Sequence, residues 1–301
     1  SIYPLLDYVF QIQKTSGYFS VNHKFNRRHL IKAGINMDVF FYDMQDSVLA
    51  PGHTADPSTH NWVKRWDYKG AAVLVQPFVQ WKWRITEKMQ FTAGLHSQYF
   101  SSSKSISPVE PRIGWKLNMR NGQAISAGGG MHSMTQPMYT YFYHQTDANG
   151  NKVYENKDMD FSRSLHSGVG YEKAFKKSLN LKAEAYYQYL YNIPVTVDPS
   201  AFSLINMGGG FQRFFPENLE NTGTGQNYGV ELTLQKFFNK SFFFLFSGTV
   251  YNSEYTASDD ITRSTSYNGN YIFNLLAGKE FKLNEKNSIS LGFKTTFAGG
   301  K

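Results

Sequence analysis

The segment 225–255 alternates apolar and polar residues in the way that an extended strand with two different faces requires. Apolar side chains occupy every second position of its first half: Tyr228, Val230, Leu232 and Leu234. Polar side chains, Glu231 among them, fall between these positions. A period of two is that of a β-strand with one apolar and one polar face. We expect a chain reversal at 238–240, followed by a second, Phe-rich strand of similar length.

The length of these strands limits the possible folds further. Each spans about ten residues or more, whereas strands of soluble sheets usually have about five or six. A tilted strand that crosses a bilayer needs about 9–11 residues. We therefore predict that the apolar set of 225–237 faces lipid and that Glu231 faces a water-filled interior.

Five further hairpins repeat this pattern along the chain, which gives roughly twelve strands in total. They are expected at 17–25 and 30–42, 68–83 and 89–100, 112–119 and 123–132, 164–175 and 179–191, and 267–283 and 288–298. Residues 1–15 are interpreted as the end of a loop. Pro77 lies inside an expected strand and lacks an N–H donor, so a bulge or kink is predicted there.

The connections between these strands alternate between short and long. Turns of a few residues separate the two strands of each hairpin, and longer polar loops are expected at 45–66, 101–110, 134–163, 193–224 and 256–266. All short turns then lie at one end of the sheet and all long loops at the other, as in transmembrane barrels. A sandwich or a propeller does not combine such long strands with such unequal connections.

The aromatic residues fit this interpretation, although aromatic residues also favour strands in general. Trp81, Trp83 and Trp115 fall near strand ends, where membrane barrels carry interfacial girdles. The sequence therefore predicts an all-β fold, an antiparallel up-and-down transmembrane β-barrel that spans residues 1–301.

Composition excludes several other classes of protein. The 301-residue chain has no Cys, which excludes a disulfide framework or a thiolate metal site. No apolar run approaches the roughly 18 residues of a membrane helix. The net charge of +8 is spread over turns rather than clustered, so we expect no nucleic-acid partner. The first ten residues do not have the pattern of a signal peptide, so one was removed or the chain is a piece of a longer protein.

Motifs for cofactors and metals do not match established patterns. The glycines of 223–229 have the wrong spacing for a dinucleotide fingerprint and precede a strand. His53 and His60 flank Asp56 in one loop, but at no established ligand spacing. We therefore expect no cofactor, no metal site and no catalytic residue.

An outer-membrane hydrolase is one alternative function. His132, Ser133, Asp158 and Asp160 are the residues that could suggest such an enzyme. They lie in or beside a long loop, where polar residues are expected in any case, and no G-x-S-x-G motif occurs. We therefore expect that the chain is not an enzyme.

Charged residues of both signs lie on the polar faces of the predicted strands. They are Lys32, Asp38, Arg112, Lys116, Lys182, Glu184, Glu231, Glu280 and Lys294. They would line a channel or contact a plug, although any wide barrel has a wet interior of mixed charge.

Aromatic clusters in two long loops are the candidates for ligand contact, since exposed aromatic clusters often mark binding surfaces. The candidate residues are Tyr139, Tyr141, Tyr143, Phe211 and Phe214. The alternative is that these loops pack on themselves.

Four stretches of the chain resemble TonB-dependent outer-membrane receptors, in the C-terminal half of their barrel. They are GTGQNYGVELTLQKFF (223–238), YNGNYIFNLLAGKEFKL (267–283), EPRIGWKLNM (110–119) and LKAEAYYQYLYNIPV (181–195). The most similar group is the Bacteroidetes type, whose members carry a carboxypeptidase-regulatory-like N-terminal domain. The resemblance covers at least residues 110–300.

This resemblance implies a barrel of about 22 strands with a plugged lumen, of which this chain would supply about 12. It also implies outer-membrane lipid, the receptor's own plug domain, a TonB-type energy-coupling protein and a surface lipoprotein as partners. The cargo would be a scarce nutrient: an iron chelate, cobalamin, a glycan or a peptide. The location would be the outer membrane of a Gram-negative bacterium.

The chain departs from the family pattern at both ends. The plug and the regulatory-like domain are not present in this sequence, and it closes on Ala298-Gly299-Gly300-Lys301 rather than on a terminal aromatic residue. We therefore expect a partial barrel, an open or strongly curved sheet with two unpaired edges. The alternative is a passive porin-like channel of about twelve strands, which would close on itself.

Overall fold

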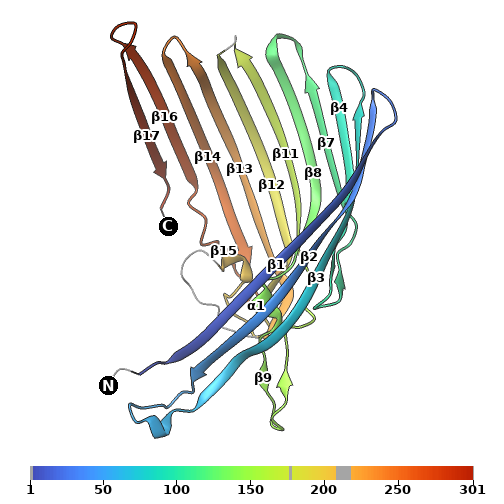
Figure 1. Cartoon of the computed structure of the whole chain (residues 1–301), viewed down its shortest axis with the longest axis vertical. Coiled ribbons are helices and arrows are strands. Elements are labelled where there is room, and N and C mark those ends of the chain that lie inside the picture. The colour runs from blue at the N-terminus through green and yellow to red at the C-terminus, as the bar shows by residue number, and fades with distance from the viewer. Residues whose placement is uncertain (1–2, 176–177, 208–217, 301) are drawn as a thin grey trace.

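The computed structural model describes residues 3–175, 178–207 and 218–300. One antiparallel sheet of 15 strands dominates it (Figure 1). Twelve strands follow one another across the sheet in chain order: β1 (Leu6–Lys24), β2 (His29–Leu49), β3 (Trp62–Arg84), β4 (Met89–His96), β7 (Glu110–Asn118), β8 (Gln123–Met134), β11 (Ser162–Phe175), β12 (Leu179–Thr196), β13 (Leu219–Asn239), β14 (Phe242–Thr256), β16 (Tyr271–Lys282) and β17 (Ser288–Ala298).

The remaining elements are short, and most belong to the long connections. They are η1 (Pro57–Thr59), β5 (Tyr99–Phe100), β6 (Ser105–Ile106), α1 (Met138–Tyr141), β9 (Gln145–Thr146), β10 (Lys152–Val153), η3 (Leu204–Asn206) and β15 (Thr262–Ser264). The exception is η2 (Arg120–Gly122), which forms the tight turn between β7 and β8. None of the helices found in the described ranges is long and apolar enough to cross a membrane.

The topology confirms the predicted all-β, up-and-down arrangement. Consecutive strands of the twelve-strand path pair antiparallel, and the path runs from β1 at one margin to β17 at the other. Within the described residues β1 pairs only with β2, and β17 only with β16, so the sheet is open (Figure 1). This confirms the prediction of a partial barrel with two unpaired edges.

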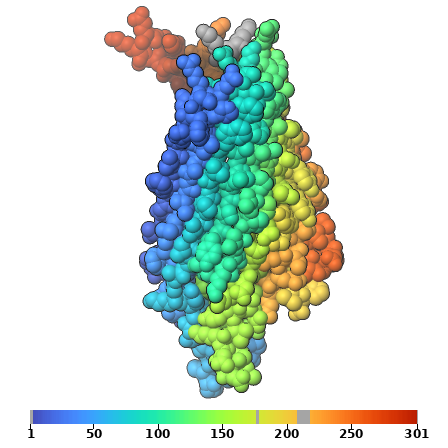
Figure 2. Space-filling model, turned by 90° about the vertical axis from the view of Figure 1, so that its right-hand side faces the viewer, coloured from blue at the N-terminus to red at the C-terminus, as the bar shows by residue number. Residues whose placement is uncertain are grey.

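The connections have the predicted asymmetry. The short turns lie at one end of the long axis, and the β9–β10 hairpin projects at the opposite end (Figures 1 and 2). We call these the turn end and the loop end of the sheet. The turn end has tight reversals such as Lys240–Ser241, where both residues have positive φ (54° and 61°). The reversal predicted at 238–240 therefore lies one residue later, after a register shift between Lys236 and Asn239.

The register confirms the two predicted faces of β13. Tyr228, Val230 and Leu232 are exposed on one face, and Val230 lies opposite Ala185 of β12. Glu231 lies on the other face, opposite Glu184. The loops pack against this second, polar face, as described below, so we call it the inner face of the curved sheet.

Two boundary predictions were wrong because the strands continue beyond bilayer length. Residues 6–15 are not a loop, since β1 begins at Leu6 and pairs with β2 up to Val48. Much of 45–66 is also extended, because β2 ends at Leu49 and β3 begins at Trp62. Polar residues obscure the apolar pattern in the extensions of β2 and β3, whereas β1 does alternate there, with apolar residues at Leu6, Tyr8, Phe10 and Ile12. Cross-strand ion pairs accompany them, for example Lys69–Asp43 at 3.1 Å.

The prediction of a bulge or kink at Pro77 was also wrong. The register of β3 against β2 is unbroken there, with Ile35 opposite Pro77. The missing N–H affects the other edge of β3 instead, where β4 ends at His96 and β5 begins at Tyr99. Ser97 N still donates to Pro77 O at 3.2 Å, but Pro77 has no donor to return. The expected strand 89–100 is therefore split in two.

Candidate functional site

The long loop between β8 and β11 folds back onto the inner face at the loop end. Its aromatic side chains form one buried cluster with residues of β2 and β3: Tyr42, Met44, Trp66, Ala72, Leu74, Phe100, Tyr141, Phe142, Tyr143, Met159, Phe161, Leu204 and Leu219. Leu219 begins β13 and Leu204 lies in η3, in the connection before that strand, so the loop also packs against the far part of the fold. This places the loop inside the curved sheet rather than over its outer face.

Ring contacts and hydrogen bonds hold this loop to the strands. The ring of Phe142 stacks on that of Tyr68 with centroids 3.8 Å apart. Trp66 Nε1 donates to the carbonyl oxygen of Tyr139 at 2.7 Å. Within the loop, the backbone N of Gln136 donates to the Tyr141 hydroxyl at 3.0 Å. The buried aromatic area and the bond from Trp66 together hold the loop against the strands.

The five sequence-predicted ligand residues have different positions in the structure. Tyr141 and Tyr143 lie in the buried cluster, and Tyr139 is half-buried at its edge. Burial raises the pKa of the Tyr139 and Tyr141 hydroxyls above their usual range. Phe211 and Phe214 lie outside the described residues. Ligand contact by these residues stays a prediction.

A cavity of about 720 Å³ lies between the folded loop and the inner face. It is lined by His132, Ser133, Met134, Gln136, Pro137, Tyr139, Ser162, Arg163, Ser164, Gln188, Leu190, Ile193, Leu204, Ile205 and Met207. The volume is within the range of small-molecule sites, and its lining combines an apolar majority with a few polar groups, as such sites do. Of the five candidate residues, Tyr139 is the one that lines it.

The charge within this cavity is held in place by hydrogen bonds. Arg163 Nη2 and the Asp160 carboxylate form an ion pair at 2.5 Å. Asn192 Nδ2 donates to the same carboxylate at 3.4 Å, and the backbone N of Asp160 is bonded to Asn221 Oδ1 at 3.0 Å. The cavity wall therefore presents a guanidinium whose charge is largely neutralised.

A buried polar cluster next to the cavity was not predicted from the sequence. Glu110 of β7 is fully buried, and its carboxylate accepts from His96 Nδ1 at 2.8 Å, Arg112 Nη2 at 3.0 Å and Gln98 Nε2 at 3.1 Å. Burial of a charged carboxylate without hydrogen-bond partners costs much free energy. The three donors to Glu110 offset that cost here. The sequence did contain one indication of this cluster: Glu110 starts an alternating strand, and Arg112 follows two residues later on the same face.

His132 lies beside this cluster and has a second histidine as its neighbour. Its Nε2 atom is 3.1 Å from Nε2 of His166, on the adjacent strand β11. The carboxylate of Asp160, another residue considered for a hydrolase, forms an ion pair with Arg163. His132 and Asp160 are thus engaged in other contacts.

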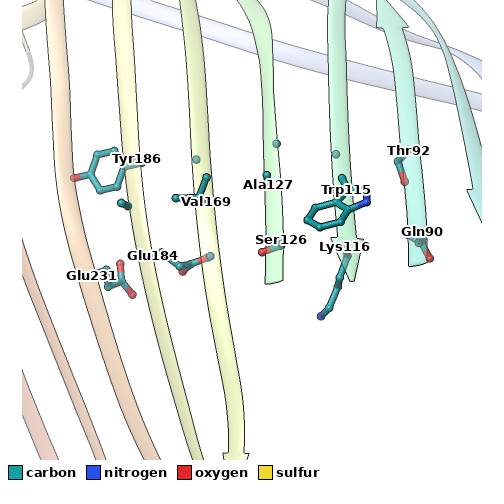
Figure 3. Close-up of a pocket in the computed structure, with 15 residues that line it drawn as sticks. Gln90, Thr92, Trp115, Lys116, Ser126, Ala127, Val169, Glu184, Tyr186 and Glu231 are labelled. Carbon is teal, nitrogen blue, oxygen red and sulfur yellow. The ribbon is translucent and has the colours of Figure 1, made fainter. Parts of the chain in front are cut away.

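A second hollow of about 550 Å³ lies on the inner face towards the turn end (Figure 3). Its polar lining includes Gln90, Thr92, Lys116, Ser126, Glu184 and Glu231. Glu184 and Glu231 stand directly opposite each other, and Lys182 Nζ is 2.6 Å from Glu184. This confirms the mixed-charge inner wall, although like charges directly opposite destabilise a strand pair.

Metal ligands are sparse in the part of the chain that the structure describes. No group of three or more His, Cys, Asp or Glu side chains there is arranged to hold a metal ion. The loop residues His53 and His60 have ring centroids 6.4 Å apart, and each has a ring nitrogen bonded to a backbone oxygen.

Comparison with known proteins identifies the family. The family model "TonB dependent receptor-like, beta-barrel" matches residues 3–300. No curated protein sequence matches the chain.

Solved structures of receptors have the same fold at low sequence identity. The FrpB iron transporter from Neisseria meningitidis (F3-3 variant) matches with a TM-score of 0.65 and 11% identity, over 95% of this chain and 42% of that one. The ferric yersiniabactin uptake receptor FyuA from Yersinia pestis matches with a TM-score of 0.65 and 10% identity, over 99% and 44%. The siderophore receptor PirA from Pseudomonas aeruginosa matches with a TM-score of 0.60 and 13% identity, over 96% and 49%.

The chain therefore spans less than half the length of each of these solved structures. The family describes receptors rather than enzymes, in agreement with the expectation from the sequence. Since the family model covers nearly all of its residues, the chain belongs to the TonB dependent receptor-like, beta-barrel family.

Proposed function

We propose that the chain is part of the barrel wall of an outer-membrane receptor that takes up a scarce nutrient actively. The observation that carries this proposal is the cavity of about 720 Å³ at the loop end, between the folded loop and the inner face. A receptor must hold its cargo where the outer loops meet the lumen, and this cavity has the size and the mixed lining of a small-molecule site. The inner polar face and the outer apolar face support the membrane position.

We propose a metal chelate as the first cargo class to test, ahead of cobalamin, a glycan or a peptide. The support is indirect: the matched structures include an iron transporter, a siderophore receptor and a ferric yersiniabactin uptake receptor. The cavity adds a chemical argument, because His132 and Gln188 give it an imidazole and an amide. An imidazole is a ligand for first-row transition metals, and an amide can hydrogen-bond the oxygen atoms of a chelator.

The partners in this proposal are outer-membrane lipid, the receptor's own plug domain, a TonB-type energy-coupling protein and a surface lipoprotein. The plug and the coupling contact belong to parts of the receptor outside residues 1–301. The location is the outer membrane of a Gram-negative bacterium, and the Bacteroidetes-type group stays part of the proposal.

Uptake by the full-length receptor tests this function. Cells that carry the receptor are given radiolabelled ferric chelates, with cobalamin, a peptide and an oligosaccharide as the alternative cargoes. The expected result is saturable uptake of one cargo that stops when the TonB-type partner is deleted or the proton gradient is dissipated. Non-saturable flux that survives both treatments would show a passive channel and overturn the proposal.

A further inference from the structure

Two histidines face each other on the inner face, at the edge of the cavity. His132 of β8 lines the cavity and is half-buried, and His166 of β11 is exposed. Their Nε2 atoms are 3.1 Å apart, their ring centroids are 4.3 Å apart, and the ring planes differ by 20°. The two strands do not need this contact, because their ladder is continuous from Ser162–Met134 to Lys173–Gln123.

The two rings can share a hydrogen bond. With a proton on one Nε2, that N–H donates to the other Nε2 at 3.1 Å, and the tautomers decide which ring is the donor. The pair therefore holds at most one proton between its two Nε2 atoms when both imidazoles are neutral and so bonded, which leaves a nitrogen lone pair available to a ligand.

The same distance is suitable for two ligands of one metal ion. With metal–nitrogen bonds of about 2.0–2.1 Å, a separation of 3.1 Å corresponds to a ligand–metal–ligand angle of about 100°. This value lies between the angles of square-planar and tetrahedral sites, the geometries typical of Cu²⁺, Ni²⁺ and Zn²⁺. The register of β8 and β11 therefore brings two nitrogen ligands within reach of one metal ion.

We propose that His132 and His166 bind one first-row transition metal ion through their Nε2 atoms, as an open two-histidine site. The proposal deepens the proposed function and rests on it: the ion belongs to the cargo held in the cavity. Each ring has to turn about its Cβ–Cγ bond to direct its lone pair at the ion. Because His166 is exposed and His132 is only half-buried, that rotation is not blocked by core packing.

The surroundings leave the other coordination positions to the cargo. No third His, Cys, Asp or Glu of the described residues completes the site. Glu110 is occupied by His96 and Arg112, and this contact also neutralises the guanidinium nearest to the pair. An ion that arrives with chelator oxygens or water on its remaining positions fits such an open site.

Direct metal titration tests the site. The full-length receptor is purified in detergent and titrated with CoCl₂, whose d–d absorption reports nitrogen ligation. We expect His132→Ala and His166→Ala each to weaken Co²⁺ binding about 10-fold or more, since removing even an outer-shell partner costs about 10–100-fold. The double variant should bind Co²⁺ more weakly than either single variant, because neither nitrogen ligand of the pair then remains.

His23→Ala is the matched control, since His23 contacts the ring of Phe25 on the first strand and lies far from the pair in the register. This variant should bind Co²⁺ as the wild type does. Heat-modifiable mobility on gels establishes that each variant is folded. If folded His132→Ala and His166→Ala receptors keep the wild-type Co²⁺ affinity and spectrum, the site does not exist. That result would leave the proposed function standing if wild-type uptake still depends on the TonB-type partner.

Discussion

Replacing Phe142 with Ala tests whether the loop between β8 and β11 is held to the inner face by its aromatic cluster. Phe142 is 4% exposed, stacks on Tyr68 at 3.8 Å and contacts Tyr42 at 5.1 Å. A buried Phe→Ala change costs about 3–5 kcal/mol, of which the ring pairs supply about 0.5–1.5 kcal/mol each. If the loop opens as a local unit, a loss of about 3 kcal/mol raises its open population roughly 100-fold.

Hydrogen exchange of the His144 amide measures this opening. In the folded loop that N–H donates to the carbonyl oxygen of Arg65 on β3 at 3.2 Å, so it exchanges only when the loop leaves the strand. We expect exchange at His144 to be about 100-fold faster in Phe142→Ala, with amides of the sheet centre unchanged. Val153→Ala, at a 37% exposed position of the same loop, is the control and should cost less than about 0.5 kcal/mol. Unchanged protection at His144 in a folded Phe142→Ala receptor would refute the idea that the cluster holds the loop.

Three further predictions follow from single residues. Burial lowers the pKa of His144, so its imidazole binds a proton more readily when the loop is undocked. Protection of the loop amides from hydrogen exchange should therefore be full at neutral pH and fall as the pH drops below about 6.5. His144→Phe should flatten this pH dependence. Gly122→Ala should destabilise the receptor by about 1–2 kcal/mol or more, because φ is +68° and the new Cβ would lie 2.9 Å from the carbonyl oxygen of Ala174; a stable variant in denaturant titrations would contradict the turn geometry. Glu110→Ala should cost about 1–3 kcal/mol, since it leaves the partly buried His96 imidazole and the Arg112 guanidinium without their shared acceptor. A loss below about 0.5 kcal/mol in the same titration would speak against the cluster.

Local pattern was sufficient to predict the wall of this protein. The alternation of apolar and polar residues is visible within each single strand. Val230 and Glu231 could therefore be assigned to the correct faces without knowledge of any partner strand. Turns can also be predicted from local sequence. The alternation of short and long connections then predicted which end of the sheet carries the turns and which carries the loops. The pattern failed where polar residues interrupt it, at the loop-end extensions of β2 and β3, because pairing there continues in water and needs no apolar face.

The candidate site depends on contacts between residues far apart in the sequence, which local sequence patterns do not predict. Tyr141 and Tyr143 were considered as exposed loop residues, but the loop turns inward and buries them against β2 and β3. His132 and His166 are 34 positions apart, and only the register of β8 on β11 brings their nitrogens to 3.1 Å. The sequence by itself determined an alternating, membrane-type wall and its two faces, because those depend on residues i and i+2. Only the tertiary structure decided where the loops pack and which polar groups meet, because those depend on strand register and on long-range burial of aromatic surface.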